Sequence, residues 1–173
     1  FSQKGPGAMH APWLISLAAG LVVGGLSQVS RLCTVGGFRD LFLFKKSILI
    51  FGYLAVLIGV FVVNISFGNF HLGFENQPIA HTDGLWNFLG MALAGFCSVL
   101  LGGCPLRQLI MTGEGNSDSA VTVLGLAAGA AFAHNFGLAA SGAGPTLNGQ
   151  IAVGVGFILA LIIAVVNTKR ANA

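Results

Sequence analysis

Long apolar runs, separated by short polar or glycine-rich segments, dominate this chain. Five windows are apolar for long enough to cross a bilayer: residues 13–29, 47–67, 85–102, 119–140 and 150–167. At about 1.5 Å of rise per residue, each reaches roughly 26 to 33 Å, which matches a hydrocarbon core about 30 Å thick. Because lipid offers no hydrogen bonds, the backbone of such windows must pair internally, as it does in helices. We therefore predict an all-α, polytopic integral membrane protein with about five transmembrane helices.

Two segments interrupt this apolar pattern in a similar way. The stretches 33–39 and 102–107 each contain a glycine pair, a cysteine and an arginine, although the spacing from cysteine to arginine differs. Interrupted hydrophobic segments in corresponding positions are typical of transporter binding sites. The pattern predicts short half-helices at 34–44 and 105–112, re-entrant or buried between the spans. It also indicates a single membrane domain, 1–173, with loosely repeated units at 13–67 and 85–140 and a final helix at 150–167.

The composition excludes an ordinary soluble domain. Of the 173 residues, 55% are hydrophobic and only 8% are charged, whereas about 25% are charged in soluble proteins. The net charge of +3 fits a membrane topology rather than a nucleic-acid surface, because the loop 68–84 contains Glu75 and Asp83 but no Lys or Arg. If the five spans alternate, the other side carries Lys45, Lys46, Arg107, Lys169 and Arg170. The positive-inside rule makes that side cytoplasmic, which places the N-terminus outside and the C-terminus in the cytoplasm.

The most specific chemistry lies beside Cys104. Gly102 and Gly103 allow a tight turn that exposes backbone N–H groups, and Pro105 suits the first position of a helix. Cys104 would then cap this helix at the positive end of its macrodipole, which favours a thiolate and attracts anions. Arg107 adds a positive charge one turn later. We therefore predict a substrate-binding point for an anion at Gly102, Gly103, Cys104 and Arg107.

Other candidate residues have both a binding and a structural interpretation. Cys33 repeats the setting of Cys104 and is a second candidate thiol. Cys97 lies inside a continuous apolar helix, where packing explains it as well as substrate contact does, and Cys104 itself could be a small apolar filler. His134 and Asn135 lie deep in the fourth span. They are interior polar groups with satisfied hydrogen bonds, a proton relay or substrate contacts.

The charged residues near the thiols also have alternatives. Arg107 either contacts substrate or holds Glu114, and the structural role is slightly favoured. Arg39 and Asp40 are expected to form a local ion pair. Three cysteines without a Cys-x-x-Cys pair predict neither a disulfide framework nor a zinc site, and no metal or cofactor is expected.

A polar elbow at 113–119 precedes the fourth span. Asn116 or Ser117 is available there as the N-cap of the following helix. Within that helix, small residues spaced by four predict a face for close helix packing, formed by Gly125, Gly129 and Ala133.

Several of these motifs resemble the YeeE/YedE family of sulfur-transport membrane proteins. They are GGCPLRQLI at 102–110, GEGNSDS at 113–119 and AFAHNFG at 131–137. QPIAHT at 77–82 and RLCTVGG at 31–37 are similar to the YedE branch associated with selenium metabolism. The resemblance covers nearly the whole chain, which is about half as long as the longer members and is similar to their C-terminal half.

The resemblance implies a bacterial inner-membrane protein in which thiosulfate passes along a row of cysteines toward the cytoplasm. Carried onto this chain, it assigns the row to Cys33 and Cys104, with Cys97 as a third thiol. It also implies that the chain is half of a longer polypeptide, or that a homologous N-terminal half, a second subunit or a second copy completes the pathway. A cytoplasmic sulfur or selenium acceptor protein is a further expected partner.

From these features we predict a transporter or channel-like protein, not an enzyme, that takes up a small sulfur- or selenium-containing anion. The main alternative is a membrane-embedded relay enzyme in which Cys104 carries a persulfide-like adduct. A third interpretation is a structural subunit whose half-helices only fill space. The sequence does not separate transport from relay chemistry, because both require an accessible thiolate.

Overall fold

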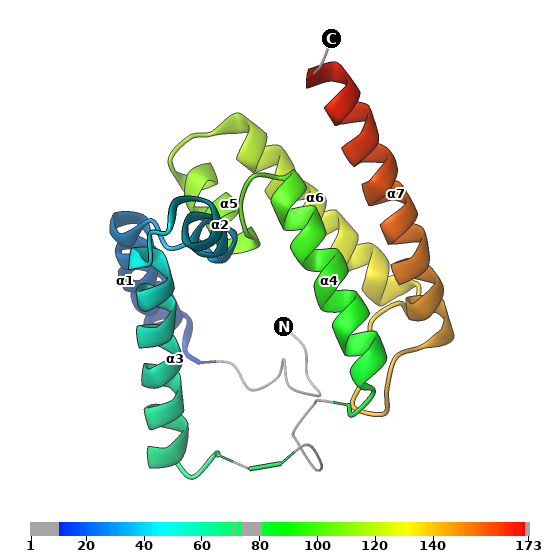
Figure 1. Ribbon diagram of the computed structural model, residues 1–173. Coiled ribbons are helices and arrows are strands. Elements are labelled where there is room, and N and C mark those ends of the chain that lie inside the picture. The colour runs from blue at the N-terminus through cyan, green and yellow to red at the C-terminus, as the bar shows by residue number, and fades with distance from the viewer. Residues whose placement is uncertain (1–10, 71, 74–80, 172–173) are drawn as a thin grey trace.

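The computed structural model describes residues 11–70, 72–73 and 81–171, and this part of the chain is all-helical, as predicted. Glu75 and residues 77–80 of the QPIAHT motif lie outside it. The helices are α1 (Trp13–Ser30), α2 (Thr34–Phe44), α3 (Ile48–Ser66), α4 (Gly84–Leu100), α5 (Pro105–Gly113), α6 (Ser117–Asn135) and α7 (Leu147–Ala171) (Figure 1). The one β-type pairing among the described residues is an isolated bridge between Ser141 and Gly144.

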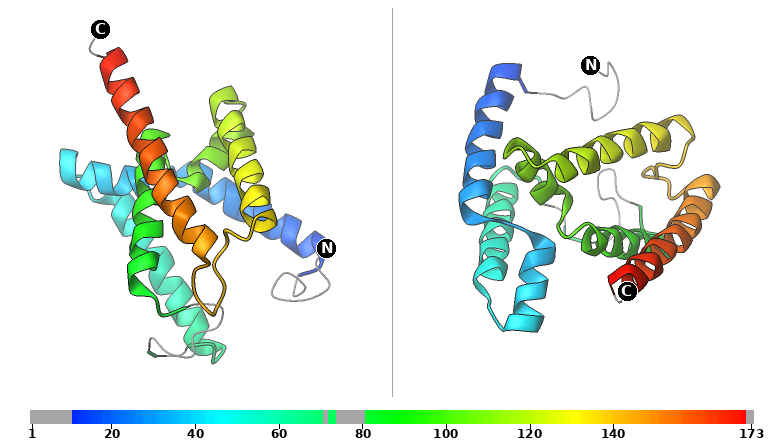
Figure 2. Two further views of the ribbon diagram at one scale, coloured as in Figure 1. Left: turned by 90° about the vertical axis from the view of Figure 1, so that its right-hand side faces the viewer. Right: turned by 90° about the horizontal axis from the view of Figure 1, so that it is seen from above.

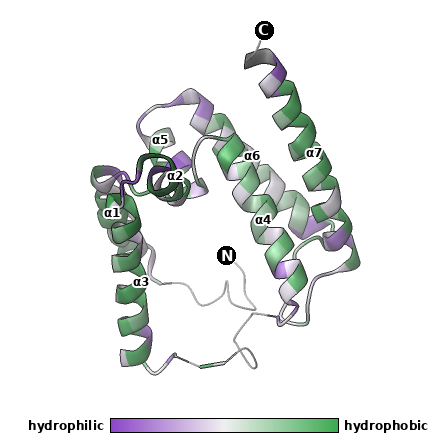
Figure 3. Cartoon of the chain, in the orientation of Figure 1, coloured by the Kyte–Doolittle hydropathy of each residue, from purple (hydrophilic) through white to green (hydrophobic). Residues whose placement is uncertain are grey.

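Four stretches are long and apolar enough to cross a membrane. They are Trp13–Phe44, Ile48–Ser66, Gly84–Gly113 and Leu147–Lys169, so two of them join a long helix to the short helix that follows. Apolar residues run along these helices (Figure 3), and the two most apolar stretches are those of α3 and α7. The remaining predicted window, 119–140, forms α6, which is not one of the four. The chain is therefore a multi-pass membrane protein, and the expected five spans are an approximate count.

The two predicted half-helices are present as α2 and α5, and each follows the same backbone turn. Leu32 and Gly103 each donate an N–H to the carbonyl five residues earlier, on Ser27 and Ser98. The residue before each of them, Arg31 or Gly102, has a positive φ, of 51° and 73° respectively. This left-handed closure ends a helix and redirects the chain. It therefore places a cysteine, two residues later, at the start of each short helix.

The helices pack mainly in pairs. α5 lies against α6, α2 against α3 and α4 against α7, while α1 touches α5 and α2 touches α4 more sparsely. α1 is steeply inclined to α3, α4 and α7 (Figure 2). The buried apolar residues of the described chain are Cys33, Cys104 and Ala160. Since most large apolar side chains are exposed and none of those described is fully buried, lipid or further protein must cover them.

The long helices have two distinct ends. The end of α3 and the starts of α4 and α7 lie at the lower end in Figure 1, and the α2–α3 connection and the end of α7 lie at the upper end. The connection carries Lys45 and Lys46, and α7 carries Lys169 near its end, whereas Asp83 precedes α4. The basic end is therefore opposite the Asp83 end, and its cytoplasmic placement stays a prediction from the positive-inside rule.

Candidate functional site

Cys33 is the N-cap of α2. Its backbone is extended, and its Sγ accepts a hydrogen bond from the Gly36 N–H at 3.3 Å. The side chain is only 8% exposed. A Cβ added to Gly36 would lie 3.3 Å from the Cys33 Cβ, which is closer than ordinary contact. Alanine at this position would therefore require Cys33 to shift by a few tenths of an ångström.

Cys104 is the N-cap of α5, with Pro105 at the first helical position, as expected. It is 6% exposed. Its thiol lies beside the backbone N–H groups of Arg107 and Thr34 and beside the side chains of Cys33 and Thr34, although it does not close a capping hydrogen bond of good geometry. Because Thr34 begins α2, the N-terminal ends of both short helices meet at this one thiol.

The Cys104 thiol borders a cavity of about 720 Å³, called here the thiol cavity. α2 contributes one wall, α4 the opposite wall, and the turn before α5 closes one end. The residues that line it are Thr34, Val35, Phe38, Arg39, Phe42, Met91, Ala94, Gly95, Ser98, Val99, Gly102, Cys104 and Pro105. Its surface is thus mostly apolar, and its polar lining residues are Thr34 and Arg39 of α2, Ser98 of α4 and Cys104. Such a site suits a small ligand with one polar end and one polarizable end.

Arg107 does not line the thiol cavity, and its side chain contacts other residues of the chain. Its Nη1 lies 3.6 Å from Glu114 Oε1 and donates to Gln28 Oε1 at 3.3 Å. These contacts tie α5 to α1 and to the elbow before α6, in agreement with the structural alternative. In that elbow, the Asn116 side chain accepts the Ser119 N–H at 2.9 Å, so Asn116 is the cap.

The arginine that lines the thiol cavity is Arg39, which the sequence analysis treated only as part of an ion pair. The pair exists, with Arg39 Nη2 3.0 Å from Asp40 Oδ1, but the Arg39 side chain remains 57% exposed. The sequence spacing could have indicated that Arg39 lines the cavity. Thr34, Phe38 and Phe42 recur at intervals of four on this short helix, and Arg39 lies next to that row.

Gly102 lines the thiol cavity, whereas Gly103 is not among its lining residues. Gln108, which the sequence analysis did not single out, fixes this turn: it is 4% exposed and donates from Nε2 to the Leu101 carbonyl at 3.0 Å. Its position in the sequence, one helical turn after the N-cap Cys104, could have indicated this role. Ser98, also missed, lies one turn before Gly102 and borders the same cavity.

The remaining candidates lie apart from the two thiols. Cys97 is half-buried on α4 and is not among the residues that line the thiol cavity. His134 and Asn135 are exposed in the last turn of α6. The structure therefore brings together Cys33, Cys104 and Gly102 but does not bring Cys97, His134 or Asn135 to them.

Comparison with known proteins agrees with the resemblance drawn from the motifs. The sequence profile of the Sulphur transport family matches residues 29–171, which include both short helices. The thiosulfate transporter TsuA of Escherichia coli (strain K12) is 30% identical over 111 residues, which is 62% of this chain and 30% of that protein. The match thus spans less than a third of the curated relative. No solved structure matches the chain. The chain belongs to the Sulphur transport family, the family of YeeE and YedE.

Proposed function

We propose that this protein takes up a small sulfur-containing anion, such as thiosulfate, and that the anion binds where α2 and α5 begin. The observation that carries the proposal is the position of the Cys104 thiol, which lies beside the first N–H groups of α2 and α5 on the wall of the thiol cavity. The relative named for thiosulfate transport supports the same class of substrate.

The arrangement matches the two ends of thiosulfate. Helix N-termini stabilise anions through free N–H groups and the macrodipole, which offsets part of the hydration that the sulfonate oxygens lose. The terminal sulfur is polarizable and forms only weak hydrogen bonds with water. It therefore loses little hydration when it moves into contact with a buried thiol and with Phe38. Sulfate has hard oxygens at every corner and loses more hydration in such a cavity. A selenium analogue of thiosulfate has the same form and is a second proposed substrate.

The exposed apolar faces of the chain bear on its partners. Because the buried apolar residues of the described part number so few, we propose that a homologous half, a second subunit or a second copy covers faces that lipid does not. Such a covering part is the way in which Cys97, His134 or Asn135 could come to contact substrate. We further propose a bacterial inner-membrane location with the C-terminus in the cytoplasm, where an acceptor protein receives the sulfur or selenium.

The test is uptake of ³⁵S-labelled thiosulfate by proteoliposomes that contain the intact protein. Cys104→Ala and Cys104→Ser are each expected to lower uptake at least tenfold, because the serine oxygen restores size but not polarizability. Cys97→Ala is the matched control and should retain most of the uptake. Unchanged uptake in both Cys104 variants would remove this thiol from transport.

A relay enzyme is the second candidate, and the closeness of Cys33 to Cys104 favours it. In that reaction the Cys104 thiolate attacks the terminal sulfur of thiosulfate, the sulfur–sulfur bond breaks, and sulfite leaves with its electron pair. The product is a persulfide on Cys104. Mass spectrometry after exposure to thiosulfate distinguishes the two functions: a gain of one sulfur atom on the Cys104 peptide supports the relay, and an unmodified peptide during active uptake supports simple transport.

A further inference from the structure

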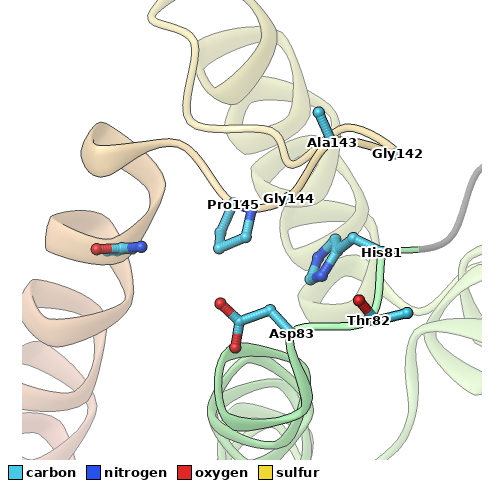
Figure 4. A pocket seen from close by; sticks show the side chains of 8 residues that line it. His81, Thr82, Asp83, Gly142, Ala143, Gly144 and Pro145 are labelled. Atoms are coloured by element: carbon cyan, nitrogen blue, oxygen red, sulfur yellow. The ribbon is translucent and has the colours of Figure 1, made fainter.

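A second pocket lies at the opposite end of α4 from the thiols. It has a volume of about 310 Å³ and is called here the His81 pocket. His81, Thr82 and Asp83 approach it from the start of α4, the loop from Gly142 to Pro145 covers it, and Gln150 closes it from the first turns of α7 (Figure 4).

The walls of the His81 pocket are held in place by hydrogen bonds. Asp83 caps α4, accepting the Trp86 N–H on Oδ1 at 3.4 Å, and the Asn87 side chain donates to the His81 carbonyl at 3.2 Å. The covering loop is closed by two backbone hydrogen bonds between Ser141 and Gly144, of 3.0 and 3.1 Å. The pocket therefore has a built-in shape instead of resulting from loosely placed side chains.

Two groups in the His81 pocket lack the partners that such groups usually have. Nδ1 of His81 is buried and has no hydrogen-bond partner. Asp83 is the only charged side chain that lines the pocket. By contrast, Asp40 and Glu114 pair with Arg39 and Arg107, whereas no ion pair is found for Asp83 within the described residues.

Separate cavities follow one another along α4 from the His81 pocket to the thiols. A neighbouring cavity of about 260 Å³ shares His81, Pro145 and Gln150 with it and reaches Met91. Met91 also lines the thiol cavity. Asn87, Met91, Ala94 and Ser98 follow one another at intervals of three or four on one side of α4, which is the spacing of a continuous helix face.

Anion uptake itself creates the need for a cation site. An inside-negative membrane potential opposes the inward movement of a dianion, so accumulation requires that cations accompany it. A proton needs only an acceptor and a nearby negative charge, both of which this pocket supplies, whereas a metal cation would need more oxygen ligands than these side chains offer. Asp83 is the other titratable residue that lines the pocket, and neither the loop 142–145 nor Gln150 adds another.

We propose that the His81 pocket is a proton-binding site, in which His81 and Asp83 hold the proton that accompanies the sulfur-containing anion. The inference rests on the proposed function, since it supplies the ion that would drive that transport. If the orientation predicted from the basic residues holds, the pocket opens on the outer side, where the proton and the anion are both taken up.

The experiment uses the intact protein in proteoliposomes with a pH-sensitive dye trapped inside and the membrane potential clamped. Adding thiosulfate outside should acidify the interior of wild-type vesicles. His81→Gln and Asp83→Asn should still let ³⁵S-thiosulfate equilibrate across the membrane. They should show no acidification, and the accumulation driven by a pH gradient should fall at least tenfold. Asparagine remains a good N-cap, so Asp83→Asn keeps the start of α4 intact.

Asp118→Asn is the matched control, because it removes an exposed carboxylate from the first turn of α6 and should leave proton movement unchanged. Thiosulfate uptake without acidification in wild-type vesicles would overturn the proposal, as would full acidification in the His81→Gln, Asp83→Asn double variant. Absence of any thiosulfate uptake by the wild-type protein would instead overturn the proposed transport function.

Discussion

At the residue scale, the position of the Cys33 thiol depends on a glycine one turn later. The Gly36 N–H donates to Cys33 Sγ, and a Cβ on Gly36 would crowd the Cys33 Cβ at 3.3 Å. Thiols are weak acceptors, so this bond contributes little to stability. Its consequence is orientation, since it keeps the Cys33 sulfur at the helix start and near Cys104.

Gly36→Ala should therefore impair transport more than stability. The new methyl group would crowd Cys33, while alanine favours the helix by up to about 1 kcal/mol, so the net change in unfolding free energy should be within about 1 kcal/mol. The KM for thiosulfate should rise severalfold. Gly37→Ala is the control, because its Cβ would meet only ordinary contacts, at 3.5 Å and beyond. Equal KM values for the two variants would contradict the role assigned to Gly36.

At the element scale, the two short helices carry arginines with different tasks. Arg39 of α2 borders the thiol cavity, whereas Arg107 of α5 binds Gln28 and Glu114. Both sequences place an arginine after a cap cysteine. The difference arises because α2 faces α4 across the cavity and α5 packs against α6.

Substitution of these arginines should separate binding from stability. Arg39→Gln should raise the KM for thiosulfate severalfold with little loss of stability. Arg107→Gln should lower the unfolding free energy in detergent by about 1 kcal/mol or less, the range for a partly exposed ion pair, with a nearly unchanged KM. Steady-state uptake and denaturant unfolding measure the two quantities. The reverse pattern would return Arg107 to the binding site.

At the scale of the whole molecule, the chain has little interior of its own. Few apolar side chains are buried, and an added Cβ at Gly125 or Gly129 of α6 would meet nothing within 4 Å. The small-residue face predicted on α6 is thus uncovered in the described chain. A helix of a homologous half or of a second copy could approach it closely.

Gly129→Leu should therefore weaken association without unfolding the chain. The larger side chain has space within the chain itself but would keep a neighbouring helix away, with an expected loss of about 1 to 2 kcal/mol of association free energy, roughly tenfold in affinity. Energy transfer between labelled chains in lipid measures the affinity. Gly59→Leu on α3, which also has nothing within 4 Å, tests whether any added bulk has this effect. Equal losses at both positions would argue against a specific face.

The local structure could be predicted from short stretches of the sequence. Helix lengths follow from the match between apolar windows and the bilayer, and the start of α5 follows from glycine, cysteine and proline in order, because these signals act over a few neighbouring residues. The same holds for Cys33 and Cys104 as N-caps. Membership of the Sulphur transport family likewise followed from contiguous motifs.

Which of these residues meet depends instead on how the helices pack in three dimensions. The contact of Cys104 with Cys33 and Thr34 joins segments about seventy residues apart in the chain, and it depends on how α2, α4 and α5 are placed. The exchange of roles between Arg39 and Arg107 and the pairing of His81 with a loop before α7 have the same origin. Local patterns report which groups a helix carries, but the direction in which each group points is set by packing between helices distant in sequence.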